Sequence, residues 1–99
     1  MSMKFDRTLY WDPSRWEDIV VIDVECEEIG LKAEWYYNCE GMRNDIEGTI
    51  NGREFCWDEA IPKLVDLDDP SAKRLLEQVL RALVRVQLLE WKLEEVTNA

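Results

Sequence analysis

A regular alternation of apolar and polar residues between positions 19 and 39 constrains the fold more than any other feature of this sequence. Two stretches, residues 19–28 and 31–39, place apolar side chains at every second position, and the dipeptide Ile29-Gly30 separates them. A period of two is typical of a β-strand with one buried and one solvated face. The sequence therefore predicts an antiparallel hairpin with a turn of two or four residues centred on Ile29-Gly30.

The position of this turn predicts which residues pair across the hairpin. The apolar faces of the two strands coincide when Val24 lies opposite Trp35, which supports that register. The same register places Glu25 directly opposite Glu34. Like charges that face each other destabilise a sheet, so this pairing raises the question of what the acidic face of the hairpin is for.

A second hairpin is predicted from the dipeptide Asn51-Gly52, which is the strongest short signal for a two-residue hairpin turn. Alternating residues flank it on both sides between positions 45 and 58. Apolar residues of both arms, such as Ile46 and Trp57, share one face, and acidic residues share the other.

A long helix is predicted from the dipeptide Asp69-Pro70, because Asp is favoured at the N-cap and Pro at the first helical position. The helix should run over residues 70–96 and measure about 40 Å at roughly 1.5 Å per residue. The predicted fold class is therefore α+β, an antiparallel sheet of two β-hairpins (about four strands) packed on one long C-terminal helix. We expect a single domain over residues 1–99, with an aromatic N-terminal arm or short helix at 1–18 and the sheet at 19–58.

Apolar residues occupy most of the circumference of the predicted helix, and such a helix must be buried on most of its surface. One small sheet covers one side, so we expect a homodimer. In the alternative, Trp11, Trp16 and the segment 60–68 cover the other side within a monomer. The predicted dimer interface consists of Leu76, Leu80, Leu83, Val84, Leu88 and Trp91.

The formal net charge is −10, and its distribution is uneven. Residues 1–69 hold 18 acidic and 7 basic side chains, whereas residues 70–99 hold 4 and 5. This charge disfavours direct binding to nucleic acid or to an anionic membrane and favours a basic partner. The predicted partner-binding residues are the acids on the polar face of the two hairpins, Asp23, Glu25, Glu27, Glu34, Asp45, Glu47, Glu54 and Asp58.

Two other interpretations of this acidic face stay open. It can be a solvated outer face that keeps the protein soluble, although solubilising faces normally mix charges of both signs, and only Lys32 does so here. It can also be a carboxylate cluster that binds a metal ion. We expect no metal and no cofactor.

We expect no catalytic residues and no enzymatic activity. The sequence has no histidine, which excludes histidine-dependent triads and histidine metal ligands. Cys26, Cys39 and Cys56 lack the spacing of a zinc site and are expected to be buried thiols. An odd number of cysteines without an apolar signal segment predicts a reduced, cytoplasmic protein.

In general character the chain resembles the small acidic inhibitors made by phages, above all anti-CRISPR proteins. The resemblance rests on the length of 99 residues, the acidic stretch 17–59, the absence of catalytic residues and the predicted self-associating helix. It implies binding to a CRISPR effector subunit in the cytoplasm of a bacterial host, and exclusion of target DNA from that subunit.

Two rival functions are consistent with the same composition. An immunity or antitoxin protein also masks a basic toxin site with carboxylates. A dimeric scaffold protein would carry the acidic surface for solubility alone.

Overall fold

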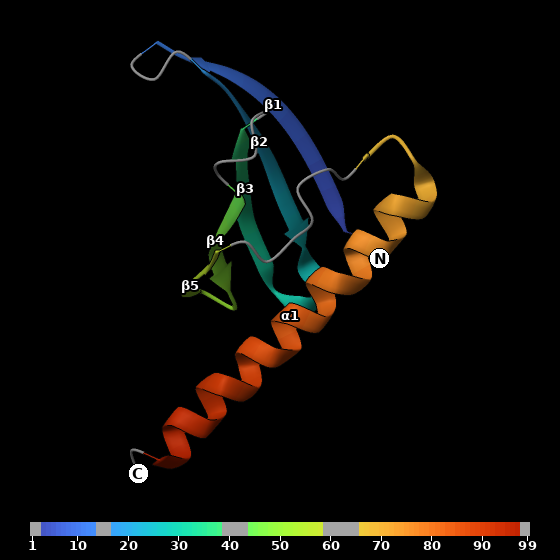
Figure 1. Ribbon diagram of the computed structural model, residues 1–99. Coiled ribbons are helices and arrows are strands. Elements are labelled where there is room, and N and C mark those ends of the chain that lie inside the picture. The colour runs from blue at the N-terminus through green and yellow to red at the C-terminus, as the bar shows by residue number, and fades with distance from the viewer. Residues whose placement is uncertain (1–2, 14–16, 39–43, 59–65, 98–99) are drawn as a thin grey trace. The chain divides into compact units, whose positions relative to one another are not determined.

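A computed structural model describes residues 3–13, 17–38, 44–58 and 66–97 of the chain. The chain divides into two compact units, Met1–Leu64 and Val65–Ala99. Figure 1 shows the strands of the first unit and the helix of the second. The strands are β1 (Lys4–Asp12), β2 (Glu17–Cys26), β3 (Leu31–Asn38), β4 (Asn44–Ile50) and β5 (Arg53–Asp58), and the helix is α1 (Pro70–Thr97).

The sheet has five strands in the order β1-β2-β3-β4-β5, and every neighbouring pair is antiparallel. This confirms the predicted α+β class, with one strand more than the four expected. The additional strand is β1, so most of the segment predicted as an aromatic arm or short helix is a strand instead. Phe5, Leu9 and Trp11 alternate with Asp6 and Thr8 in this segment, which is a strand pattern.

The predicted register of the first hairpin is wrong by two residues. In the structure Val24 pairs with Ala33, and Glu25 pairs with Lys32. The cause is the turn: a 3₁₀ turn at Glu27–Ile29 and Gly30 together link Cys26 to Leu31, so the loop is centred one residue earlier than expected. Because the slip is an even number of residues, every strand side chain keeps the face that the alternation predicted.

The second hairpin forms as the Asn51-Gly52 dipeptide predicts. Both residues have a positive φ, 51° at Asn51 and 85° at Gly52, as a type I′ turn requires. The turn aligns Ile50 with Arg53 and Ile46 with Trp57. The backbone N–H of Asn51 also donates a hydrogen bond of 2.9 Å to the carbonyl of Gly30, which joins the loops of the two hairpins.

One face of the sheet carries the core of the first unit. Trp35 lies at its centre on β3, where it is 1% exposed, and its indole N–H donates a hydrogen bond of 2.6 Å to the Oδ1 of the buried Asn44. Burial of a tryptophan leaves one donor to satisfy, and Asn44 supplies the acceptor. The other buried residues of the strands are Val20, Ile22, Val24, Cys26, Leu31, Ala33, Ile46, Ile50 and Phe55.

Helix α1 begins as predicted. The carboxylate of Asp69 accepts a hydrogen bond of 2.9 Å from the backbone N–H of Ser71, which is N-cap geometry. The buried residues of the helix are Leu76, Leu80 and Val84, at successive intervals of four. These three belong to the dimer interface expected from the sequence, but in the single chain they are already 3%, 0% and 1% exposed.

Candidate functional site

The face of the sheet opposite the core carries an uninterrupted line of carboxylates. Asp6 on β1 pairs with Asp23 on β2, Asp23 with Glu34 on β3, and Glu34 with Glu47 on β4. All four side chains are exposed. Directly paired residues lie on the same face, and neighbouring strands are about 4.8 Å apart, so these four acids span about 14 Å. We call Asp6, Asp23, Glu34 and Glu47 the acidic row.

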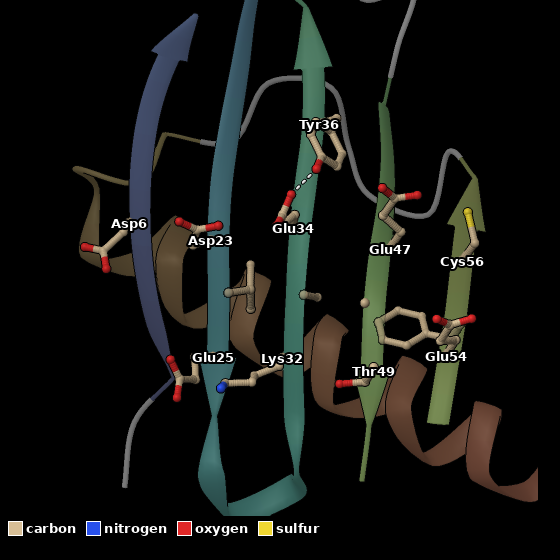
Figure 2. Close-up of a pocket in the computed structure, with 14 residues that line it drawn as sticks. Asp6, Asp23, Glu25, Lys32, Glu34, Tyr36, Glu47, Thr49, Glu54 and Cys56 are labelled. Carbon is tan, nitrogen blue, oxygen red and sulfur yellow. Dashed lines mark hydrogen bonds between the residues drawn. The ribbon is translucent and has the colours of Figure 1, made fainter. Parts of the chain in front are cut away.

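A second line of paired residues lies next to the acidic row on the same face and has a different character. Glu25 on β2 pairs with Lys4 on β1 and with Lys32 on β3, so acid and base alternate. Lys32 extends toward Glu25 in Figure 2. We call Lys4, Glu25, Lys32, Thr49 and Glu54 the mixed row.

The acidic row and the mixed row, except Lys4, line a groove of about 990 Å³ on this face of the sheet. Figure 2 shows the carboxylates of Asp23, Glu34 and Glu47 on adjacent strands across it. Gly48 also lines the groove, on β4. A Cβ atom at Gly48 would lie 2.1 Å from the carbonyl oxygen of Lys32, so the absence of a side chain allows β3 and β4 to approach closely.

Glu34, in the middle of the acidic row, has a local hydrogen-bond partner. The hydroxyl of Tyr36, two residues along β3, donates a hydrogen bond to the Oε2 of Glu34 (Figure 2). Tyr36 is half-buried. This bond gives the Glu34 carboxylate a partner on its own strand.

Cys56 on β5 completes the acidic row, because it pairs with Glu47. It is an exposed free thiol, and its Sγ donates a hydrogen bond of 3.9 Å to the Oδ1 of Asp58. Partial desolvation, followed by the negative charges of Asp58, Asp45 and Glu47, raises the pKa of the Cys56 thiol. Raising this pKa favours the uncharged thiol, which is the less nucleophilic form.

The structure brings together most of the acids predicted to bind a partner. Asp23, Glu25, Glu34, Glu47 and Glu54 line the groove. Asp45 and Asp58 pair with each other in the adjacent row, which is beyond the groove.

Glu27 lies in the 3₁₀ turn and not in a strand, so its expected place on the strand face is wrong. The prediction failed there because the turn begins before the alternating pattern ends. Cys26 is buried as expected, whereas Cys56 is exposed, and Cys39 lies outside the described residues.

Sequence reasoning missed Asp6, Lys4 and Cys56 as members of this surface. Asp6 and Lys4 were missed because β1 was not recognised: Phe5, Leu9 and Trp11 recur at odd positions, but Arg7 interrupts the alternation. Cys56 was assigned to the core by residue type alone. Its place between Phe55 and Trp57 on β5 requires it to point to the acidic face.

No protein-family model, no curated protein and no solved structure matches this chain. Among the described residues, no group of three or more His, Cys, Asp or Glu side chains is arranged to hold a metal ion. Within the same part of the chain, no helix is both long and apolar enough to cross a membrane. The arrangement of charge on the sheet is therefore the observation on which a function has to be argued.

Proposed function

We propose that the protein is a non-enzymatic inhibitor that uses the acidic row to occupy a basic nucleic-acid-binding surface of another protein. The observation that carries the proposal is the unbroken line Asp6, Asp23, Glu34 and Glu47 across four adjacent strands. Each directly opposed like-charge pair costs a sheet up to about 1 kcal/mol. A basic partner removes this repulsion when it binds.

The spacing of the acidic row suits a surface that normally binds a phosphate backbone. Its carboxylates follow one another at about 4.8 Å, the distance between strands. Each strand of duplex DNA carries one phosphate charge per about 3.4 Å of helix axis. The Lys and Arg side chains of a nucleic-acid channel are long and flexible, so they can adapt to the spacing of the carboxylates.

The groove makes part of the acidic surface concave. Lysine and arginine side chains of a partner can enter a concave surface of about 990 Å³ and contact carboxylates from several strands at once. Exposed charges at such a surface mainly accelerate association and are screened by salt beyond about 8–10 Å. Binding should therefore weaken steeply as ionic strength rises.

The partner that we propose is a DNA-binding subunit of a CRISPR effector complex, so that the protein acts as an anti-CRISPR in the cytoplasm of a bacterial host. The proposal assigns the protein no catalytic residue, no metal and no cofactor. It follows from the acidic row together with the resemblance in length and charge to small phage inhibitors.

The experiment is a DNA-binding assay on a panel of purified CRISPR effector complexes. Near-stoichiometric amounts of the protein should prevent target DNA binding by at least one complex, and a variant with Asp23→Asn and Glu34→Gln should require much more. Binding to a complex without any loss of DNA binding contradicts the proposed competition. If instead no complex binds and the protein neutralises a nuclease toxin, the immunity interpretation replaces this one.

A further inference from the structure

Helix α1 carries a second apolar stripe in addition to its buried residues, and all of its members are exposed except Val79, which is half-buried. Its members follow one another at alternating intervals of four and three residues, which is the a/d pattern of a coiled-coil heptad repeat. They are Leu75, Val79, Ala82, Val86, Leu89, Leu93 and Val96. We call these seven residues the seam.

The seam is separate from the buried side of the helix. At about 100° per residue, its centre lies roughly 150° around the helix from the stripe of Leu76, Leu80 and Val84. Leu89 is 60% exposed and Leu93 is 66% exposed. Three heptads of leucine and valine in water form a larger apolar surface than a single exposed residue, and such surfaces mark interaction sites.

The second half of the helix needs a partner for a further reason. From Val86 to Thr97 no residue is buried, and only Gln87 and Trp91 are half-buried. An isolated helix of this length is marginal in water. Apolar contacts to this half would therefore stabilise the helix.

We propose that the seam forms a parallel two-stranded coiled coil with a second copy of this chain. The a positions are Val79, Val86 and Leu93, and the d positions are Leu75, Ala82, Leu89 and Val96. Two of the three a residues are β-branched and two of the four d residues are leucine, and β-branched residues at a with leucine at d favour two parallel strands over three or four. This proposal is independent of the function proposed for the acidic row.

The charged residues beside the seam favour pairing with a second copy of this chain and favour a parallel orientation of the two helices. Arg85 occupies a g position and Glu90 the e position that follows it, and both are exposed. In a parallel dimer, the g residue of one helix faces the next e residue of the other, so Arg85 of each copy faces Glu90 of its partner. In an antiparallel dimer, g residues face one another, which would bring Arg85 and Lys92 of the two copies together.

The seam replaces the interface expected from the sequence. That expectation placed Leu88 in the interface and left Leu89 out of it. Leu88 is adjacent to Leu89 and is also exposed, at 40%, but it lies outside the seam. The two leucines therefore form a matched pair of positions that distinguishes the two surfaces.

The first experiment compares Leu89→Glu with Leu88→Glu by analytical ultracentrifugation at micromolar concentration. The unmodified chain and Leu88→Glu should be dimers. Leu89→Glu should weaken dimerisation by roughly a hundredfold or more, because it places two unpaired carboxylates in the interface. A monomeric unmodified chain, or a loss of the dimer only in Leu88→Glu, overturns the proposal.

The second experiment measures direction without disrupting the interface. Val79→Cys and Val96→Cys are made separately in a chain with Cys39→Ser and Cys56→Ser, with Leu88→Cys as control. In a parallel dimer each a or d residue faces the same residue of the other copy, whereas in an antiparallel dimer a residues face d residues. Each seam variant should therefore form a disulfide-linked dimer alone under mild oxidation, and the control should not. If the two variants crosslink only when mixed, the helices are antiparallel and the proposal is wrong.

Arg85 and Glu90 provide a third measurement. Arg85→Glu should weaken the dimer by roughly threefold to tenfold. The reason is that each of the two exposed Arg85–Glu90 pairs in the dimer becomes a pair of like charges. The exchange Arg85→Glu with Glu90→Arg should restore the original affinity. If the exchange does not restore it, Arg85 and Glu90 do not face each other across the dimer.

Discussion

The acidic row and the mixed row lie side by side on the same strands, but their charges are arranged differently. In the mixed row, Glu25 lies between Lys4 and Lys32, so these three charges have opposite partners across the strands, and Glu54 pairs with the neutral Thr49. In the acidic row, Glu34 lies between Asp23 and Glu47, so both of its cross-strand partners carry the same charge as Glu34. The charged side chains of both rows are exposed.

The difference between the rows separates solubility from recognition. A surface that only needs to be solvated can mix signs, as the mixed row does, and then gains from its cross-strand pairs. The acidic row forgoes this gain over four strands. The repulsion it retains is the reason to propose the acidic row, and not the whole face, as the binding surface.

The largest expected effect is a loss of stability when the pairing of β3 with β4, which aligns the residues of both rows, is disturbed. Gly48→Ala places a Cβ atom 2.1 Å from the carbonyl oxygen of Lys32 and 2.5 Å from the Cα of Ala33. Strand β3 or β4 must shift, and such overpacking costs about 1–3 kcal/mol. Thermal melting should show a clear loss of stability, whereas Glu47→Ala, on the same strand but exposed, should change stability by less than about 0.5 kcal/mol. Equal melting temperatures for the two variants would show that β3 and β4 are not in close contact at Gly48.

The next largest effect sharpens the comparison by removing two acids from one row at a time. Asp23→Asn with Glu34→Gln changes the acidic row, and Glu25→Gln with Glu54→Gln makes the same change of net charge in the mixed row. The first pair should weaken binding to the proposed basic partner by roughly 2- to 30-fold, since exposed ion pairs contribute about 0.2–1 kcal/mol each. The second pair should have a much smaller effect.

The measurement is the dissociation constant at two salt concentrations. The acidic-row variant should also show a shallower dependence on salt than the original protein. If both double variants lose the same affinity and the same salt dependence, net charge alone determines binding, and the arrangement of the rows has no role.

The two rows also show which part of the site could be predicted from the sequence. The alternation of Asp23, Val24 and Glu25 determines the face on which each side chain lies, because the side-chain period of a strand is two. It does not determine which strand neighbour each one meets. That depends on the loop at Glu27–Ile29, where a change of one residue in the centre of the turn moves Glu34 from Glu25 to Asp23.

Other parts of the structure were beyond single-sequence reasoning for different physical reasons. Asn44 is buried because the indole of Trp35 needs an acceptor, and no local pattern indicates such a distant pairing. The helix was predicted well because Asp69-Pro70 is a local start signal. The sequence showed apolar residues around most of its circumference, but only burial distinguishes Leu80, which is covered, from Leu89, which is exposed.

A smaller effect is a change of stability that has opposite signs in the two rows. Glu34→Gln removes the repulsion between Glu34 and its two acidic partners, and it keeps an oxygen that can accept the hydrogen bond from Tyr36. The free energy of unfolding should therefore rise by a few tenths of a kcal/mol to about 1 kcal/mol. Glu25→Gln loses two opposite-charged neighbours and should lower stability by a similar amount. This corrects the expectation from the sequence that neutralising Glu25 relieves repulsion.

Urea unfolding at low and high NaCl measures both changes. Salt screens exposed charges, so the gain in Glu34→Gln and the loss in Glu25→Gln should both shrink at high salt. Changes of the same sign in the two variants would show that the cross-strand pairs do not control stability here.

The smallest effect uses Cys56 as a reporter at the end of the acidic row. Partial desolvation and the carboxylates of Asp58, Asp45 and Glu47 raise the pKa of this thiol, so less of the reactive thiolate is present at mildly alkaline pH. Asp58→Asn removes one of these charges and should lower the pKa, which increases the thiolate fraction and the rate of alkylation by iodoacetamide below that pKa.

The experiment is done in a Cys39→Ser chain, in which the buried Cys26 should react slowly. Raising the salt concentration should accelerate alkylation of the original protein and have less effect on Asp58→Asn, because screening weakens the same repulsion. An alkylation rate that neither Asp58→Asn nor salt changes would mean that the carboxylates do not control this thiol. A bound partner that covers the acidic row should in turn slow alkylation of Cys56, since Cys56 pairs with Glu47 at the end of that row.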